Sequence, residues 1–229
     1  MKNSKVIISL LAGVVVAFAA LGVISTQTTN ARTASFAERG FVENFFDGEN
    51  DGTYNFDKAH SFINFKVKHY GLIEVPGFFR DFTGTVNYNS KDVTKSTVEF
   101  TAKTTSVDTG VAPRDKHLRT ADFFDVEKFP DMTFKSTKIE KKGKKLMIFG
   151  DFTLRGVTKQ ISFPFQIAGF AKDARGTVKI GIIADTEINR RDYGVNYTGN
   201  LPDGTLGVAD MIKVSLQIEA ILQTPPVAK

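Results

Sequence analysis

The feature that most constrains this chain is a strict alternation of apolar and polar residues that recurs from Tyr54 to Leu222. It is clear at Ile63, Phe65 and Val67, which are separated by polar neighbours. Successive side chains of a β-strand point to opposite faces, so a period of two is typical of a strand with one buried face and one face in water. The pattern therefore predicts an all-β fold.

Further runs place apolar residues at alternate positions, and together they indicate about eight strands. These runs are Phe78, Phe82, Val86 and Tyr88, taken as one strand; Val98, Phe100 and Ala102; Met132 and Phe134; Leu146 and Ile148; Ile161, Phe163, Phe165 and Ile167; Val178, Ile180 and Ile182; and Ile212, Val214, Leu216, Ile218, Ala220 and Leu222. Turn-forming residues at 142–144 and 172–176 join neighbouring runs, which favours antiparallel hairpins.

One segment departs from the alternation. Pro113, followed by residues 114–120, is typical of a short helix, because proline is tolerated in the first turn, where its missing N–H would be unpaired anyway. We expect this helix near one end of the sheet. Antiparallel strands with one apolar face can close as a barrel, and a barrel of about eight strands is either filled by side chains or holds one small ligand.

The apolar composition bears on the choice between a filled core and a ligand cavity. The chain has 21 phenylalanines and no tryptophan, which would suit a uniform apolar lining. Aromatic residues also favour strands in any packed barrel, so composition leaves both alternatives open. If a cavity exists, inward positions of the alternating runs line it. The candidate lining residues are Ile63, Phe65, Val67, Phe82, Val98, Phe100, Phe134, Phe163, Phe165, Ile180, Ile182, Val214 and Leu216.

The first residues have the pattern of an export signal. Lys2 and Lys5 precede an apolar run from Val6 to Ile24 that is interrupted by Ser9. We predict a signal peptide over residues 1–31 and a periplasmic location. The apolar run is near the shortest length that spans a bilayer, so an uncleaved membrane anchor is the alternative.

The remaining sequence divides into three parts. Residues 32–52 are polar with scattered phenylalanines, such as Phe41 and Phe45, and form either a linker or a short amphipathic helix. The alternating pattern defines a barrel domain at 53–223, and a short tail follows at 224–229. Export also places the protein close to a membrane. The sequence leaves open whether the protein forms a homodimer.

Cysteine and charge exclude several functions. The chain has no cysteine, so disulfides, thiol catalysis and zinc thiolate sites are excluded. Of its 30 basic side chains, Lys2, Lys5 and Arg32 lie before the first of the 25 acidic ones. The remaining basic and acidic side chains nearly balance, which is not the charge pattern of a nucleic-acid-binding protein.

Several motifs follow one another between about Tyr54 and Ala220. They are Asp57-Lys58-Ala59-His60-Ser61, His69-Tyr70-Gly71, Ser106-Val107-Asp108-Thr109-Gly110, Arg114-Asp115-Lys116-His117-Leu118, Asp122-Phe123-Phe124-Asp125, Gly150-Asp151-Phe152-Thr153-Leu154-Arg155-Gly156 and Ile188-Asn189-Arg190-Arg191-Asp192-Tyr193-Gly194. Taken together and in this order, these motifs resemble the YceI-like family of exported lipid- or polyisoprenoid-binding proteins.

The resemblance implies an extended, lipocalin-like antiparallel barrel that carries an isoprenoid chain in its lumen. It implies a carrier that binds, stores or transports an apolar small-molecule ligand, with no cofactor, no metal and no catalysis. The identity of the ligand comes from the resemblance alone, whereas the barrel and its apolar inner face also follow from the alternation.

Charged residues provide a second set of candidates at the mouth of the barrel. His60, Arg114, Asp115, His117 and Arg190 could orient a polar head group. The plainer alternative is an ion-pair network that fastens the short helix. A third alternative is an envelope enzyme or metal-binding protein that uses Arg114, Asp115 and His117, since histidine and carboxylate groups suit acid–base chemistry and metal ligation.

Overall fold

The computed structural model describes residues 50–223, all of which belong to one compact unit, Phe41–Lys229. The predicted signal at 1–31, residues 32–49 of the predicted linker and the tail at 224–229 lie outside the described residues. Within the described part, no helix is long and apolar enough to cross a membrane.

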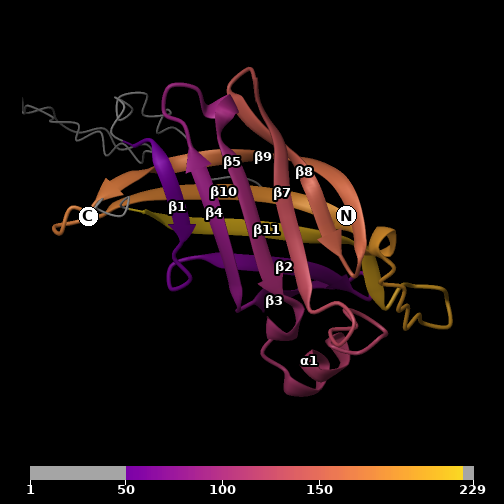
Figure 1. Cartoon of the computed structure of the whole chain (residues 1–229). Helices are drawn as coiled ribbons and strands as arrows, with labels where there is room; N and C mark the ends of the chain where they lie inside the picture. Colours follow the sequence, from indigo (N-terminus) through magenta and orange to yellow (C-terminus); the bar gives the residue numbers. More distant parts are fainter. Residues whose placement is uncertain (1–49, 224–229) are drawn as a thin grey trace, which may run out of the picture. The chain divides into compact units, whose positions relative to one another are not determined.

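Eight antiparallel strands close into a barrel, as the alternation predicts (Figure 1). In spatial order they are β1 (Gly52–Phe56), β4 (Phe82–Tyr88), β5 (Thr97–Lys103), β7 (Asp131–Lys142), β8 (Lys145–Leu154), β9 (Val157–Lys172), β10 (Val178–Asn189) and β11 (Val208–Leu222). The ring closes because β1 pairs with both β4 and β11.

Three further strands extend the sheet from β11. They are β2 (Phe62–His69), β3 (Ile73–Phe79) and the short β6 (Val107–Asp108). One edge of β11 pairs with β10 along its length, so β1 and β2 share the other edge. β1 pairs with its end at Ala220–Leu222, and β2 pairs with the stretch from Val208 to Gln217. The strand that neighbours β11 in the wall is therefore β1 at one end of β11 and β2 along the rest of it.

The predicted helix is α1, at Ala112–Leu118, and it begins with Pro113 in its first turn. It lies at the lower end of the sheet in Figure 1, beside β6 and the long connection that leads to β7. The helix and this connection close the end of the barrel at which β2 has replaced β1.

The prediction of one strand from Phe78 to Tyr88 is wrong. The chain forms β3 and β4, separated at Arg80 and Asp81. Phe79 and Phe82 are both buried although they are three residues apart, and a continuous strand would point them to opposite faces. The chain leaves the β2 side of the sheet after Phe79 and joins β5 at Phe82, which resets the alternation.

Tyr54 packs at the centre of the core and is fully buried, with 0% of its surface exposed. Its hydroxyl donates to the carbonyl oxygen of Asn50 at 2.8 Å. Burial raises the pKa of Tyr54 from 10.0 to about 12, because a phenolate would lose its hydration. The folded protein therefore holds this phenol neutral in a pH range where the unfolded chain ionises it.

We predict an alkaline loss of stability that depends on Tyr54. Below pH 10 the phenol is neutral in both states, and between pH 10 and 12 ionisation of the unfolded chain costs the folded state about 2 kcal/mol. Tyr54→Phe should lower stability by about 1 kcal/mol at neutral pH, since a hydrogen bond is lost, but flatten the alkaline decline. Urea unfolding from pH 8 to 11.5 measures both effects. An alkaline decline in Tyr54→Phe as steep as in the wild type would contradict this role of Tyr54.

Candidate functional site

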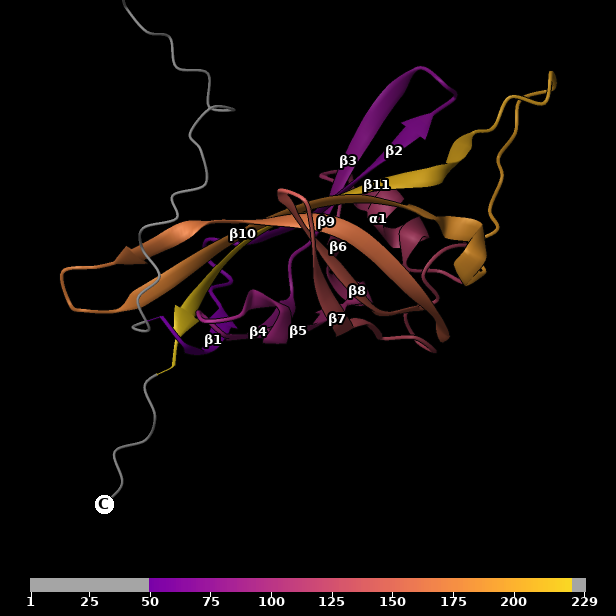
Figure 2. The same ribbon diagram turned by 90° about the horizontal axis from the view of Figure 1, so that it is seen from above.

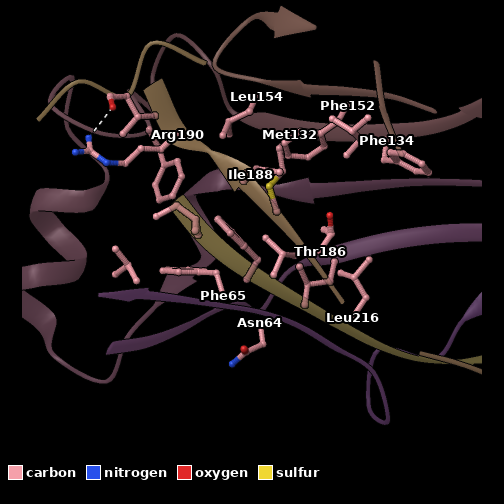
Figure 3. Close-up of a pocket in the computed structure, with 18 of the residues that line it drawn as sticks. Asn64, Phe65, Met132, Phe134, Phe152, Leu154, Thr186, Ile188, Arg190 and Leu216 are labelled. Carbon is pink, nitrogen blue, oxygen red and sulfur yellow. Dashed lines mark hydrogen bonds between the residues drawn. The ribbon is translucent and has the colours of Figure 1, made fainter. Parts of the chain in front are cut away.

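The barrel encloses a main cavity of about 130 Å³ with an apolar lining (Figure 3). Strands β2, β3, β5, β7, β8, β9, β10 and β11 all contribute to its wall, and Leu118 of α1 and Phe123 and Phe124 of the following connection close one end. Eight strands and the helical end therefore meet around one space. Only a few of the lining residues are polar, namely Asn64, Thr186 and Arg190.

Phe65 shows how local sequence shapes this wall. Its ring lies directly over Gly77 on the neighbouring strand β3, and a Cβ on Gly77 would come within 2.2 Å of the ring. Because glycine has no side chain, the ring can lie flat against the backbone. Phe134 lies over Gly150 in the same way. These two phenylalanines thus cover the wall without filling the space.

A smaller inner chamber of about 50 Å³ continues from the main cavity. The two spaces share Phe100, Phe134 and Phe163 as lining residues. The ring centroid of Phe134 lies 5.9 Å from that of Phe100 and 5.6 Å from that of Phe163. This three-ring cluster borders both chambers, so a ligand that reached the inner chamber would pass against these rings.

A third space, the vestibule, lies at the α1 end and has a volume of about 250 Å³. It shares Phe65, Val67, Leu118, Phe123 and Val208 with the main cavity, so the two are contiguous. Unlike the main cavity, it has several polar lining residues. They are Lys68, His69, Thr109, Arg114, His117 and Tyr197.

Most of the predicted lining residues lie where the alternation puts them. Ile63, Phe65, Val67, Phe100, Phe134, Phe163, Val214 and Leu216 line the main cavity, and Val98, Phe165 and Ile182 line the inner chamber. Phe82 and Ile180 are buried in the packed core, outside the lining of these two spaces. The role of all these residues in ligand binding stays a prediction.

The sequence prediction missed other lining residues. Phe152 and Leu154 continue the alternation of Leu146 and Ile148 along β8, so extending that run would have found them. The same alternation indicates Met132, which lies two residues before Phe134 on β7. Leu118, Phe123 and Phe124 have no periodic signal, because they belong to a helix and a connection that the tertiary fold places over the cavity.

Arg190 lies at the edge of the main cavity with 4% of its surface exposed. Its guanidinium donates to the backbone carbonyl oxygens of Ala209 at 3.0 Å, Val195 at 2.7 Å and Val208 at 3.1 Å, and to Asp210 Oδ1 at 2.9 Å. Burial lowers the pKa of Arg190, and the Asp210 carboxylate opposes that effect. Because backbone carbonyl oxygens and the Asp210 carboxylate accept from its N–H groups, Arg190 stabilises the start of β11 rather than presenting its charge to the cavity.

Arg114 and Asp115 hold α1 in place. Asp115 is buried and accepts from the backbone N–H of Thr109 at 2.9 Å and from the Thr109 hydroxyl. Arg114 Nε donates to Thr109 Oγ1 at 2.7 Å, and its Nη2 donates to the Thr109 carbonyl oxygen at 2.9 Å. These contacts fit the predicted alternative of a network that fastens the helix.

His117 lines the vestibule, with Nε2 2.7 Å from Asp122 Oδ2. Its ring packs edge-on against Phe123 and Tyr197, with centroid distances of 5.0 and 5.1 Å. His60 lies elsewhere. It precedes β2, whereas the vestibule residue His69 ends that strand, so the mouth group predicted from the sequence does not assemble around His60.

His60 instead lies with Asp57 and Glu219. One donor atom from each of these three residues lies within 4.8 Å of the other two. His60 Nδ1 is 2.8 Å from Asp57 Oδ2, and this hydrogen bond is the main reason that the pKa of Asp57 is lowered. Lys179 Nζ, 2.6 Å from Glu219 Oε1, already supplies a positive charge to the cluster. The cluster is therefore a compensated ion-pair network on the outer surface of the barrel.

A closed antiparallel barrel around an apolar cavity, entered through a polar vestibule, defines the class of small barrels that can enclose one apolar ligand. A family model described as the YceI-like domain matches residues 54–220. The chain belongs to the YceI-like family.

Similar proteins agree with this membership. The chain is 41% identical over 144 residues to Protein YceI of Escherichia coli O157:H7, covering 62% of this chain and 75% of that protein. It is 32% identical to the crystal structure of a Campylobacter jejuni YCEI protein, with a TM-score of 0.59, covering 69% of this chain and 91% of that one.

Two more distant structures share the fold. Burkholderia cenocepacia BcnA is 20% identical, with a TM-score of 0.63 over 72% of this chain and 98% of its own. A polyisoprenoid binding domain from Saccharophagus degradans, implicated in plant cell wall breakdown, is 16% identical, with a TM-score of 0.58 over 74% of this chain and 98% of its own.

Proposed function

We propose that this protein binds, stores or transports an apolar, chain-like lipid, an isoprenoid by the family's precedent, inside the barrel and without catalysis. The observation that carries the proposal is the main cavity, whose wall comes from eight strands and is almost entirely apolar. Membership in the YceI-like family and the fold shared with a polyisoprenoid binding domain support it.

Affinity in such a site comes from the walls. Burial of a methylene group contributes roughly 0.8 kcal/mol, so a chain of ten methylenes gains about 8 kcal/mol before the costs of binding. A hydrogen bond at the vestibule adds only about 1 kcal/mol. Polar vestibule residues such as His117 and Lys68 would therefore orient a head group more than hold the ligand.

The volumes restrict how a long chain can bind. A cavity of about 130 Å³ holds little more than one ring-sized apolar group, so a long isoprenoid must also occupy the vestibule or the inner chamber. The bound ligand would thus run along the barrel, with its head group at the α1 end.

The predicted alternative of an enzyme or metal site at Arg114, Asp115 and His117 gains no support from the geometry. Arg114 and Asp115 are both engaged with Thr109, and their contacts serve the docking of α1. The periplasmic location is part of the proposal, and its support is the charged and apolar pattern of residues 1–31.

The test of the proposal is isolation of the protein from its native envelope under mild conditions, followed by organic extraction and mass spectrometry. We expect an apolar chain-like molecule in a near-stoichiometric amount. A protein that yields no such molecule, and that also fails to take up farnesol in native mass spectrometry, would contradict the proposal.

A further inference from the structure

Five exposed apolar side chains lie on the three segments that adjoin the vestibule. Leu72 and Ile73 have 77% and 65% of their surface exposed at the turn between β2 and β3, and Val111, Leu201 and Leu206 are also exposed. We call these five residues the apolar rim. Large apolar side chains in water are unremarkable singly, but a group around a cavity entrance indicates a binding surface.

The backbone places the rim beside the vestibule. The N–H of Tyr70 donates to the Gly207 carbonyl oxygen at 3.2 Å, which joins the β2–β3 turn to the loop that carries Leu201 and Leu206. Val111 lies between the vestibule residues Thr109 and Arg114. In Figure 2, the β2–β3 hairpin and the 194–207 loop extend from the same side of the barrel.

The rim segments are almost free of charge. Residues 69–73, 109–113 and 194–207 contain no lysine or arginine and one carboxylate, that of Asp203. A segment that enters the boundary between lipid head groups and acyl chains must leave its charges in water, so this composition suits partial insertion. The same composition would contribute little to binding a strongly charged protein surface.

Positive charge lies directly behind the rim. The β2–β3 hairpin carries the exposed residues Lys66 and Lys68, of which Lys68 lies at the edge of the vestibule. The one carboxylate of the hairpin, Glu74, is 2.5 Å from Lys213 Nζ. Lys116 is also exposed on α1. An apolar tip followed by exposed lysines matches the order of layers in a bilayer, where acyl chains lie beneath a layer of phosphates.

We propose that the apolar rim docks the mouth of the barrel on a lipid bilayer, so that an apolar ligand passes between membrane and vestibule without crossing water. The inference rests on the proposed function for its purpose, but the docking itself is a separate property of the surface. A few apolar side chains give weak and reversible attachment, which a carrier requires in order to leave the membrane again.

The experiment is co-sedimentation of the purified protein with vesicles of phosphatidylethanolamine and phosphatidylglycerol. We expect the wild type to sediment with the vesicles, and the double variant Leu72→Asp, Ile73→Asp to bind at least about tenfold more weakly, since two carboxylates would enter the interface. The matched control is Phe62→Asp. Phe62 is 49% exposed at the opposite end of the same strand, β2, and its variant should bind vesicles as the wild type does.

Uptake of farnesol separates this inference from the proposed function. The double variant should retain farnesol as the wild type does, because its substitutions lie outside the cavity lining. Vesicle binding that is absent in the wild type, equal in the double variant, or lost equally in Phe62→Asp would overturn the docking proposal. If the wild type and both variants fail to bind farnesol while the wild type still binds vesicles, the proposed ligand is overturned and the docking proposal is not.

Discussion

Phe163→Asp is expected to empty the barrel, with a loss of affinity for farnesol of at least about 100-fold. Phe163 is buried and lines both the main cavity and the inner chamber, so its replacement places a carboxyl group against the ligand chain. A buried carboxyl without a partner costs several kcal/mol whether it ionises or takes up a proton. Native mass spectrometry after loading with farnesol measures the loss.

The matched control is Ser162→Asp. Ser162 is the preceding residue on β9 and is exposed, so the same side chain there faces water and should leave ligand retention unchanged. Circular dichroism must show that the Phe163 variant is folded, because loss of a core phenylalanine costs about 3–5 kcal/mol. If it is unfolded, Phe100→Asp is the second variant, since Phe100 lines the same two spaces and is less buried. A folded variant of either kind that keeps its ligand contradicts a lumenal site.

Arg190→Met is expected to destabilise the protein by about 3–5 kcal/mol, the range observed when one partner of a buried charge network is removed. Methionine resembles the apolar stem of arginine but donates no hydrogen bond, so the carbonyl oxygens of Val195, Val208 and Ala209 lose their guanidinium donors. Each buried acceptor left without a donor costs about 1–3 kcal/mol. For a domain of this size the loss corresponds to a fall in Tm of about 10 °C.

Arg191→Met is the control for this prediction. Arg191 Nε donates to the same carboxylate, Asp210 Oδ1, at 2.7 Å, but its side chain is half-buried and donates to no carbonyl oxygen of the described part of β11. Its removal should cost at most about 1 kcal/mol. Equal thermal shifts for the two variants would show that charge compensation, rather than the backbone contacts of Arg190, stabilises this end of the barrel.

The strands could be predicted from the sequence because the signal is local. Whether Phe163 points inward is decided by the pleat of its own strand, and its neighbours Ser162 and Pro164 lie on the face that meets water. The same reasoning placed most of the predicted residues, including Phe65 and Leu216, correctly on the wall of a cavity. It failed between Phe79 and Phe82, where the chain changes neighbours and the alternation restarts.

The mouth of the barrel could not be predicted in this way, because its residues meet through contacts that are distant in sequence. The carbonyl oxygens that engage Arg190 belong to residues 195, 208 and 209, and their positions depend on how β11 pairs with β2. His60 and His117 share a chemical type, yet the tertiary fold places only His117 in the vestibule.

The sequence by itself determined the all-β class, the inward face of most strands and the helix at Pro113, because strand pleat and helix initiation depend on a few neighbouring residues. Only the tertiary structure decided that β1 and β2 share one edge of β11, and that a cavity remains within the barrel. The cavity volume depends on how rings such as Phe65 and Phe134 pack over glycines on adjacent strands. That packing is a property of the closed barrel, and no single strand contains it.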